Sequence, residues 1–346
     1  MDYSLLTQKL TKEQIDQFEQ KHPLSKKAFR RFVIQIILFA AVALVFLSAA
    51  TSNLSPSSQA GVGGAIFCYI VTVLLMLGIV LMVAGLKRQT ERSARIQLFA
   101  VCNNLSYTRY VEKPTFTGMF FSLGKNRMLN DILGSLTTRP TFEIGNLEYT
   151  IRAGRSEHTY HKGYIRIQLE RNLPQIVLDA TSNDLRMFGK NISTLPVDFA
   201  QSQKMSLEGD FDKHFSLYAP KEYERDALYI FSPDLMALLI DNASAFDGEI
   251  VDNQLFIYSS LAPFNLNDPV LVERLMKIIQ VVGAKASSQT DYYSDEKVGD
   301  RSQNAVAVSG QRLRKGVSVF AIVFVIIGLL IGIVPVVIDA LGATQP

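Results

Sequence analysis

The sequence predicts a membrane protein with three transmembrane helices and one α+β cytoplasmic domain. Three apolar runs, at residues 32–50, 64–86 and 316–338, contain no Asp, Glu, Lys, Arg or His. Each run has about the 19 to 23 residues that a helix needs to cross ~30 Å of hydrocarbon. Between the second and third runs, short apolar stretches alternate with turn residues, which is typical of a soluble domain rich in β-strands.

Positive charge at the ends of the runs predicts their orientation. Basic residues precede the first run, follow the second and precede the third, whereas the link at residues 51–63 has no charge. Lys and Arg in short flanks are retained on the cytoplasmic side. We therefore expect the N-terminus inside, residues 51–63 outside, the large middle region inside and residues 339–346 outside. The basic residues are Lys26, Lys27, Arg30, Arg31, Lys87, Arg88, Arg312, Arg314 and Lys315.

A cleaved signal peptide is the alternative interpretation of the first run. Ser48, Ala49 and Ala50 offer small residues at a spacing that resembles a cleavage site. The leader is long and polar, however, and the run is longer than a usual signal-peptide core. Under either interpretation the middle region is cytoplasmic.

The regions that flank the first two runs predict further helices. Residues 1–31 form a polar cytoplasmic segment in which Thr11 and Gln14 have the spacing of a capping box. Residues 87–104 contain no Pro or Gly, so the second span is expected to continue as a juxtamembrane helix that ends near Asn103 and Asn104.

Residues 105–283 are expected to form an α+β domain, a mostly antiparallel sheet with two or three helices. The candidate strands are short runs of β-branched and aromatic residues, at residues 149–153, 164–169, 175–178, 215–218, 227–231 and 255–258. Ser232-Pro233 and Asp268-Pro269 each place a capping residue before a Pro at the first helical position. Gly283 is the expected C-terminal cap of the second of these helices.

The chain after this domain is expected to be a flexible tether to the third span. Residues 284–315 are rich in Ser, Gln, Asp and Gly. Within the third run, Gly328 and Gly332 have the spacing that lets two helices approach closely, so they are candidates for helix packing.

Charge argues for a membrane surface rather than nucleic acid as a partner. The formal net charge of the chain is +3, but residues 90–311 contain 23 Lys and Arg against 27 Asp and Glu. The positive excess therefore lies at the membrane edges, where it suits anionic lipid headgroups. No basic run interleaved with aromatic residues occurs in the soluble region, so we expect no nucleic-acid binding.

No constellation of catalytic residues is visible, so the sequence predicts a protein that is not an enzyme and that needs no cofactor. Phosphate loops, nucleophile elbows and kinase motifs are absent from the sequence. His158 and His161 are three residues apart, but nothing near them completes a tetrahedral metal site. We expect them in a solvated hairpin connection.

Glu208, Asp210 and Asp212 form the densest acidic cluster and are weak candidates for a metal site. Alternation would place their carboxylates on one face if the segment were a strand, and a cation could then bridge them. The alternative interpretation is an acidic turn between two strands.

Several strings, taken in order, resemble a family of bacterial multi-pass membrane proteins known as the domain of unknown function 3137 group. They include Asn103-Asn104-Leu105-Ser106-Tyr107, Gly118-Met119-Phe120-Phe121, Glu208-Gly209-Asp210-Phe211 and Tyr229-Ile230-Phe231-Ser232-Pro233. The resemblance covers about residues 30–285 and implies two N-terminal spans followed by a soluble α+β domain. The third run and the tether depart from that pattern, and the resemblance implies no activity and no catalytic residues.

These observations predict a membrane-anchored interaction or scaffold module of the cell inner membrane, with a membrane or cytoplasmic protein as its partner. A small-ligand sensor, a cation sensor or an unrecognised enzyme is the alternative for the cytoplasmic domain.

Overall fold

The structure is a computed structural model that describes residues 1–54, 61–154, 156–187, 190–300 and 302–316. The chain forms two compact units. Unit 1 comprises Met1–Tyr110 with Leu266–Val272, and unit 2 comprises Val111–Asn265 with the chain from Glu273 onward. Most of the third apolar run, its candidate packing residues Gly328 and Gly332, and the tail at residues 339–346 lie outside the described residues.

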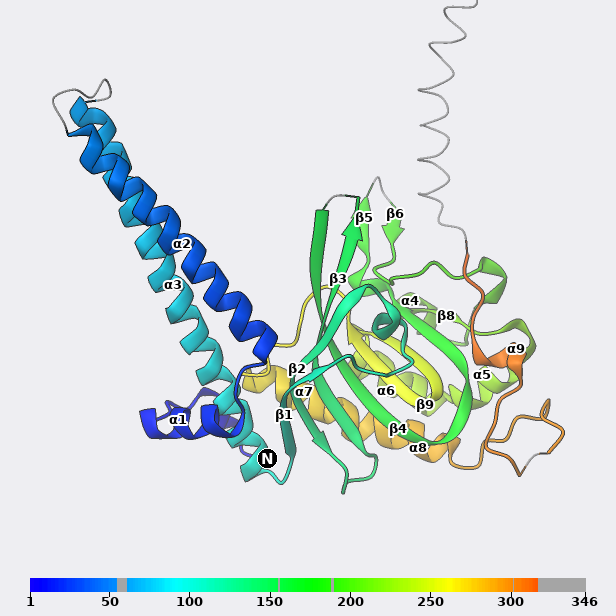
Figure 1. Cartoon of the computed structure of the whole chain (residues 1–346). Coiled ribbons are helices and arrows are strands. Elements are labelled where there is room, and N and C mark those ends of the chain that lie inside the picture. The colour runs from blue at the N-terminus through cyan, green and yellow to red at the C-terminus, as the bar shows by residue number, and fades with distance from the viewer. Residues whose placement is uncertain (55–60, 155, 188–189, 301, 317–346) are drawn as a thin grey trace, which may run out of the picture. The chain divides into compact units, whose positions relative to one another are not determined.

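Unit 1 contains a pair of long apolar helices, α2 (Lys26–Asn53) and α3 (Gly61–Cys102), which run side by side (Figure 1). Among the described residues, these two helices are long and apolar enough to cross a membrane, with mean hydropathies of 2.7 and 2.9. Only 6% and 11% of their most apolar windows are buried. Apolar side chains that face outward throughout these windows suit helices in lipid better than core helices of a soluble protein.

Helix α3 continues without a break beyond the apolar run, as the sequence predicts. It ends where Asn104 adopts a left-handed conformation, with φ of 56°. The N–H of Leu105 then bonds to the carbonyl of Ala100 at 2.8 Å, which satisfies one of the free carbonyls at the helix end.

The N-terminal segment packs on the polar end of α3. The segment contains η1 (Tyr3–Thr7) and α1 (Lys12–Lys21), and the expected capping box between Thr11 and Gln14 is present. Phe18 is buried, and the guanidinium of Arg109 lies 5.1 Å from the centre of its ring. Arg109 also donates to the carbonyl of His22 and to Oγ1 of Thr90, so a single arginine joins α1 to α3 within unit 1.

Unit 2 is built on an antiparallel sheet, which confirms the α+β class. Within the unit the strand order is β2-β3-β4-β8-β7, and β9 pairs with the edge of β4 opposite β3 and β8. A separate hairpin joins β5 (Leu185–Met187) to β6 (Lys190–Ile192). The strands of this sheet are β2 (Lys125–Ser135), β3 (Phe142–Ala153), β4 (Ser156–Ala180), β7 (Lys204–Met205), β8 (Phe215–Tyr218) and β9 (Asp247–Ser259). Strand β1 (Ser106–Glu112) begins in unit 1.

Strand β4 determines the curvature of the sheet. The sequence predicts separate strands at residues 164–169 and 175–178, but both belong to this one strand of 25 residues. Its pairing with β9 breaks register between Gln168 and Leu173 and again between Leu173 and Ile176. Such irregularities bend a strand, and Figure 1 shows β4 arching over the unit.

The helices of the soluble region agree with the sequence at two helix starts and differ at α5 and at Gly283. Helices α6 (Pro233–Ala243) and α7 (Pro269–Ile278) begin at the predicted prolines. A strand is expected at residues 227–231, but residues 227–230 belong to helix α5 (Glu224–Ile230) and Phe231 is its C-terminal cap. Ala227 and Ile230 are buried while Leu228 and Tyr229 are exposed, a spacing of three residues that fits a helix rather than alternation.

The expected helix end at Gly283 is also wrong. A π-helical turn, η6 (Ile279–Gly283), leads directly into α8 (Ala284–Thr290). A Cβ on Gly283 would lie 2.7 Å from Cδ1 of Ile167, so this glycine permits close packing of the helix on β4. The other short helices are η2 (Met119–Ser122), η3 (Thr181–Asn183), η4 (Gln201–Gln203), α4 (Phe211–His214), η5 (Lys221–Tyr223) and α9 (Val308–Gln311).

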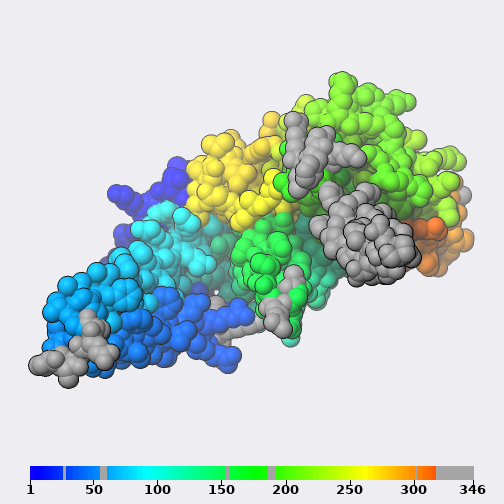
Figure 2. Space-filling view, turned by 90° about the horizontal axis from the view of Figure 1, so that it is seen from above, coloured from blue at the N-terminus to red at the C-terminus, as the bar shows by residue number. Residues whose placement is uncertain are grey.

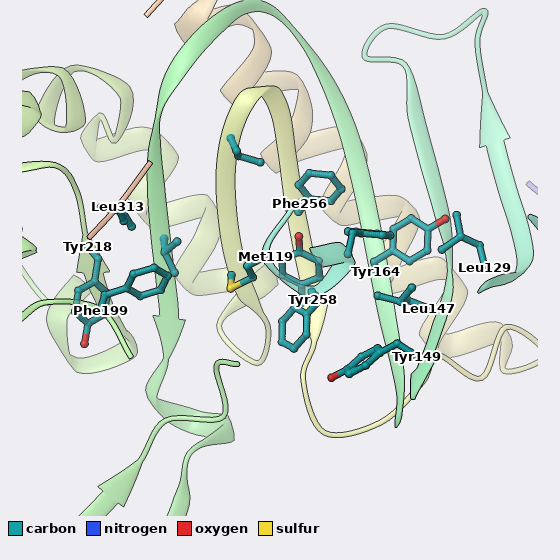
Figure 3. Packing of buried hydrophobic residues seen from close by; sticks show 14 of the residues in the cluster. Met119, Leu129, Leu147, Tyr149, Tyr164, Phe199, Tyr218, Phe256, Tyr258 and Leu313 are labelled. Atoms are coloured by element: carbon teal, nitrogen blue, oxygen red, sulfur yellow. The ribbon is translucent and has the colours of Figure 1, made fainter. Parts of the chain in front are cut away.

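An aromatic core fills unit 2. The turn η2 contributes Phe120, whose ring lies 4.8 Å from that of Tyr258, and Phe121, whose ring lies 5.2 Å from that of Tyr164. Figure 3 shows Met119 beside Tyr258, and Leu313 beside Phe199 and Tyr218. The β1–β2 loop and the C-terminal end of the described chain therefore both contribute to the same core.

Candidate functional site

The acidic residues Glu208, Asp210 and Asp212 do not lie on one face of a strand. Gly209 has φ of 72° and turns the chain, and α4 begins at Phe211. Asp212 accepts hydrogen bonds from the N–H of Leu207 at 3.0 Å and from the hydroxyl of Ser206. Asp210 instead forms a 2.6 Å ion pair with Lys213. The strand that the candidate metal site requires is therefore absent from this described segment, which forms a turn and the short helix α4.

His158 and His161 lie on β4, not in a connection. They are separated by three residues on a strand, so their side chains point to opposite faces. His161 lies 3.8 Å from Glu148 on β3. Across the described part of the chain, no group of three or more His, Cys, Asp or Glu residues is placed to hold a metal ion.

The most informative surface is formed by residues 291–316, which we call the C-terminal strap. The sequence predicts a flexible tether over residues 284–315, and this prediction is wrong. The chain forms α8, and the strap that follows packs on unit 2, as the orange segment against the green surface in Figure 2 shows. Three widely spaced apolar side chains of the strap, Tyr293, Val306 and Leu313, are buried.

Two tyrosine–aspartate pairs hold the first part of the strap. The hydroxyl of Tyr293 donates to Asp226 on α5 at 2.8 Å, and that of Tyr223 donates to Asp295 of the strap at 2.7 Å. Asp295 is 2% exposed and also accepts from the N–H groups of Lys297 and Ala307, both at 2.8 Å. These hydrogen bonds favour the charged form and hold the pKa of Asp295 below its ordinary value, although desolvation acts first and in the opposite direction.

Two further contacts hold the middle of the strap. Asn304 accepts from the N–H of Asn172 on β4 at 2.6 Å, and its backbone carbonyl accepts from the amide of Asn172. Arg312 forms two hydrogen bonds with the carboxylate of Asp252 on β9, at 2.9 and 3.2 Å. This two-point geometry makes the pair directional as well as attractive.

The last described residues of the strap extend the sheet region of unit 2. The N–H of Arg314 donates to Oε1 of Gln203 at 2.9 Å, and its carbonyl accepts from the N–H of Ala200 at 3.1 Å. Lys315 forms an antiparallel bridge with Phe199. The N–H of Gly316 donates to the carbonyl of Asp198 at 2.7 Å. The backbone is therefore bonded to the domain up to the first residue of the third apolar run.

A buried polar network joins the strap to the β1–β2 loop. Glu249 on β9 is 1% exposed and accepts from the N–H of Met119 at 2.6 Å, from Gln175 at 2.7 Å and from the hydroxyl of Tyr258 at 2.9 Å. Gln175 in turn accepts from the N–H of Leu313 at 2.8 Å. Burial raises the pKa of Glu249, and the three hydrogen bonds oppose that shift.

Three exposed cations surround the end of the strap. Lys204 lies on β7, next to Gln203, and Arg314 and Lys315 lie on the strap itself. Asp198 is the exposed carboxylate on the adjoining backbone. Within the described ranges, none of the three cations forms an ion pair with a carboxylate. This end of unit 2, which we call the basic end, therefore has an excess of positive charge.

A hollow of about 370 Å³ lies along the first part of the strap. It is lined by strap residues between Tyr292 and Lys297 and by residues of η5 and α5. The ammonium of Lys297 lies 3.6 Å from Asp226 and 3.9 Å from the centre of the Tyr223 ring. A second hollow of about 540 Å³ lies between the β2–β3 connection and α8, and five of its lining residues are Ser or Thr.

Two buried aspartates lie at the ends of β4 and β9. Asp179 is 6% exposed and Asp247 is fully buried. Desolvation, with the neighbouring charge of Asp247 as a second cause, raises the pKa of Asp179 to about 7. Asp247 accepts from the N–H of Ala180 at 2.9 Å, from Asn183 at 3.1 Å and from Ser260. Its partners are all within the fold, so the position is structural.

Sequence reasoning missed the strap and the network around Glu249. The strap has too few buried apolar residues to show a period, and several of its hydrogen bonds reach residues far away along the chain. Glu249 did leave one signal, because it is an acid between Gly248 and the buried Ile250 and Val251 in a strand. A lone acid in such a context indicates a buried, hydrogen-bonded carboxylate.

Comparisons with known proteins leave the family open. No family model matches the chain, and no curated protein matches it. A solved structure with partial likeness is that of the mycobacterial trehalose monomycolate transport factor A, TtfA, with a TM-score of 0.34 and 9% identity. The likeness covers 55% of this chain and 95% of that one. At this level it says nothing of function, and the resemblance to the bacterial membrane family stays a prediction.

Proposed function

We propose that this protein is a membrane-anchored interaction module of the bacterial inner membrane, with the soluble domain on the cytoplasmic side. The two apolar helices of unit 1 and the basic flanks of all three runs support this topology. In this proposal the third run, residues 316–338, is a third span and the chain ends outside.

The observation that carries the proposal is the hydrogen bond between Gly316 and Asp198. It leaves no free chain between the folded domain and the first residue of the third run. A flexible linker would let a domain search a volume around its anchor. A domain bonded up to its span is instead held in one orientation, which suits a protein that presents a surface to a partner.

The topology is tested with reporters and with an exposed cysteine. Alkaline phosphatase fused after Ala60 or after Pro346 should be active, because both positions lie outside in the proposal. A cysteine that replaces Tyr292, which is 92% exposed, should react with a membrane-impermeant thiol reagent only after cells are opened. Labelling of intact cells at this position would contradict the topology.

The interaction is tested by capturing partners from gently solubilised membranes. The same capture is repeated with Gly310→Ala, in which a Cβ would collide with Tyr223 and loosen the strap. Gly299→Ala is the matched control, because a Cβ there meets nothing. A partner that the control retains and the strap variant loses supports an interaction that depends on the fixed orientation of the domain. If no partner is recovered and the purified protein turns over a metabolite, the chain is an enzyme and the proposal is wrong.

A small-ligand sensor is the second candidate, and the hollow along the strap favours it. Ligand binding between Asp226, Lys297 and the tyrosines would act directly on the contacts that hold the strap. A library of polar metabolites screened against the full chain in detergent tests this candidate. A ligand that binds only the native state stabilises it by about 2.7 kcal/mol at a hundredfold excess over Kd. The melting temperature of the protein should therefore rise.

A further inference from the structure

We propose that the basic end of unit 2 is a docking surface for anionic phospholipid headgroups. The inference rests on the proposed function, because it requires that the third run enters the bilayer. It adds that Lys204, Arg314 and Lys315 bind the membrane surface itself, in addition to the anchor.

Chain continuity places this surface. The third apolar run, residues 316–338, contains no charged residue and directly follows Lys315. A span that begins at Gly316 places this residue near the headgroups. The bonds from Gly316 to Asp198 and from Arg314 to Gln203 then bring residues 198–204 to the same depth. The side chains of these residues consequently lie within about a Debye length, ~10 Å, of the bilayer surface.

Charge identifies the partner as anionic. Among the described residues at this end of unit 2, the exposed charges are the three cations and Asp198, while the half-buried Asp184 and the buried Asp179 also interact with Lys204. Residues 90–311 as a whole contain more acidic than basic residues. Each Lys or Arg near an anionic leaflet raises the binding constant of the protein for that surface by about fivefold. An anionic surface should therefore attract the basic end, although residues 90–311 as a whole carry a net negative charge.

The strap holds two of the cations beside the third. The backbone of residues 314–316 is bonded to residues 198–203, so Arg314 and Lys315 are kept next to Lys204. Leu313, just before them, is buried against Phe199 and Tyr218 (Figure 3), which fixes the direction in which the strap leaves the core.

The test places the full chain in nanodiscs of phosphatidylcholine alone or with increasing phosphatidylglycerol. In a background of Cys68→Ala and Cys102→Ser, a fluorophore is attached at Ser202→Cys, and a control fluorophore is attached at Ser288→Cys on α8. Lipids with a quencher on the headgroup report the distance of each fluorophore from the bilayer. We expect stronger quenching at position 202 than at position 288, and quenching at 202 that rises with phosphatidylglycerol.

Charge variants separate the two proposals. Lys204→Gln and Lys315→Gln should each weaken the phosphatidylglycerol dependence by about fivefold, and Lys277→Gln on α7 should leave it unchanged. Quenching at 202 that ignores phosphatidylglycerol would overturn the lipid site while leaving the anchored domain in place. No quenching at 202 in either bilayer would contradict the held orientation as well.

Discussion

The side-chain amide of Gln175 donates to the carboxylate of Glu249 at 2.7 Å, between two neighbouring strands and away from water. The other end of the same amide accepts from the backbone of Leu313, and the other oxygen of Glu249 accepts from the backbone of Met119. Two residues thus connect the β1–β2 loop to the strap through the sheet. A buried network of this kind is stabilising only while every member is paired.

The variant Gln175→Ala should be strongly destabilising. It leaves one oxygen of Glu249 and the N–H of Leu313 without partners inside the fold, and a buried unpaired polar group costs about 1–3 kcal/mol. Near-UV circular dichroism of the tyrosines follows urea unfolding, because the chain has no Trp and the core has several Tyr. The exposed Gln280→Ala is the control. A midpoint equal to that of the control would show that the network contributes nothing.

The variant Gly310→Ala should loosen the strap. A Cβ at this position would lie 2.4 Å from Cζ of Tyr223, so the strap must move away from the ring that anchors Asp295. Gly299→Ala is the matched control, since nothing lies within 4 Å of a Cβ there. Hydrogen exchange over residues 291–316 should become faster in the first variant alone. Equal exchange in both variants would mean that the contact with Tyr223 is not what holds the strap.

The parts of the fold that the sequence predicts are those with a local signal. Uniform apolar runs predict α2 and α3, and capping residues followed by Pro predict α6 and α7. These patterns repeat within one or two turns, so distant contacts do not change them.

The strap and the acidic cluster lack such a signal. Asp295 is paired with Tyr223 and Gln175 with Leu313, at separations of 72 and 138 residues, and composition does not encode such pairs. At the cluster, Gly209 and a short helix replace the strand on which the candidate metal site depended. A single residue with positive φ is enough to break the alternation that the sequence suggested.

The variant Arg109→Ala should release the N-terminal segment from α3 within unit 1. It removes the donors to His22 and Thr90 and the cation over the Phe18 ring. Arg109 is 8% exposed, so its loss also leaves a gap beside Phe18. Limited proteolysis should cut between residues 1 and 25 faster in this variant than in Arg88→Ala, an exposed control on α3. An unchanged rate of proteolysis would mean that the buried Leu6 and Phe18 hold the N-terminal segment on α3 without Arg109.

The stability of the domain should fall as the pH rises from about 4 to about 7, because of Asp179. Its pKa is about 7 in the fold against an ordinary value of 3.8, so the folded state binds the proton more tightly than the unfolded state does. Below pH 4 both states are protonated and Asp179 costs nothing. Between pH 4 and pH 7 the cost of the buried charge grows, at about 1.4 kcal/mol per pKa unit, and above pH 7 it is complete.

The variant Asp179→Asn should abolish this dependence. Its amide oxygen can still accept from Ser193, which donates to Asp179 at 2.8 Å, but it has no charge to desolvate. At pH 8 the variant should therefore unfold at higher urea than the wild type, and at pH 4 the two should converge. The exposed Asp241→Asn on α6 is the control and should follow the wild type throughout. Parallel midpoints for Asp179→Asn and the wild type from pH 4 to pH 8 would show that Asp179 keeps its ordinary pKa in the fold.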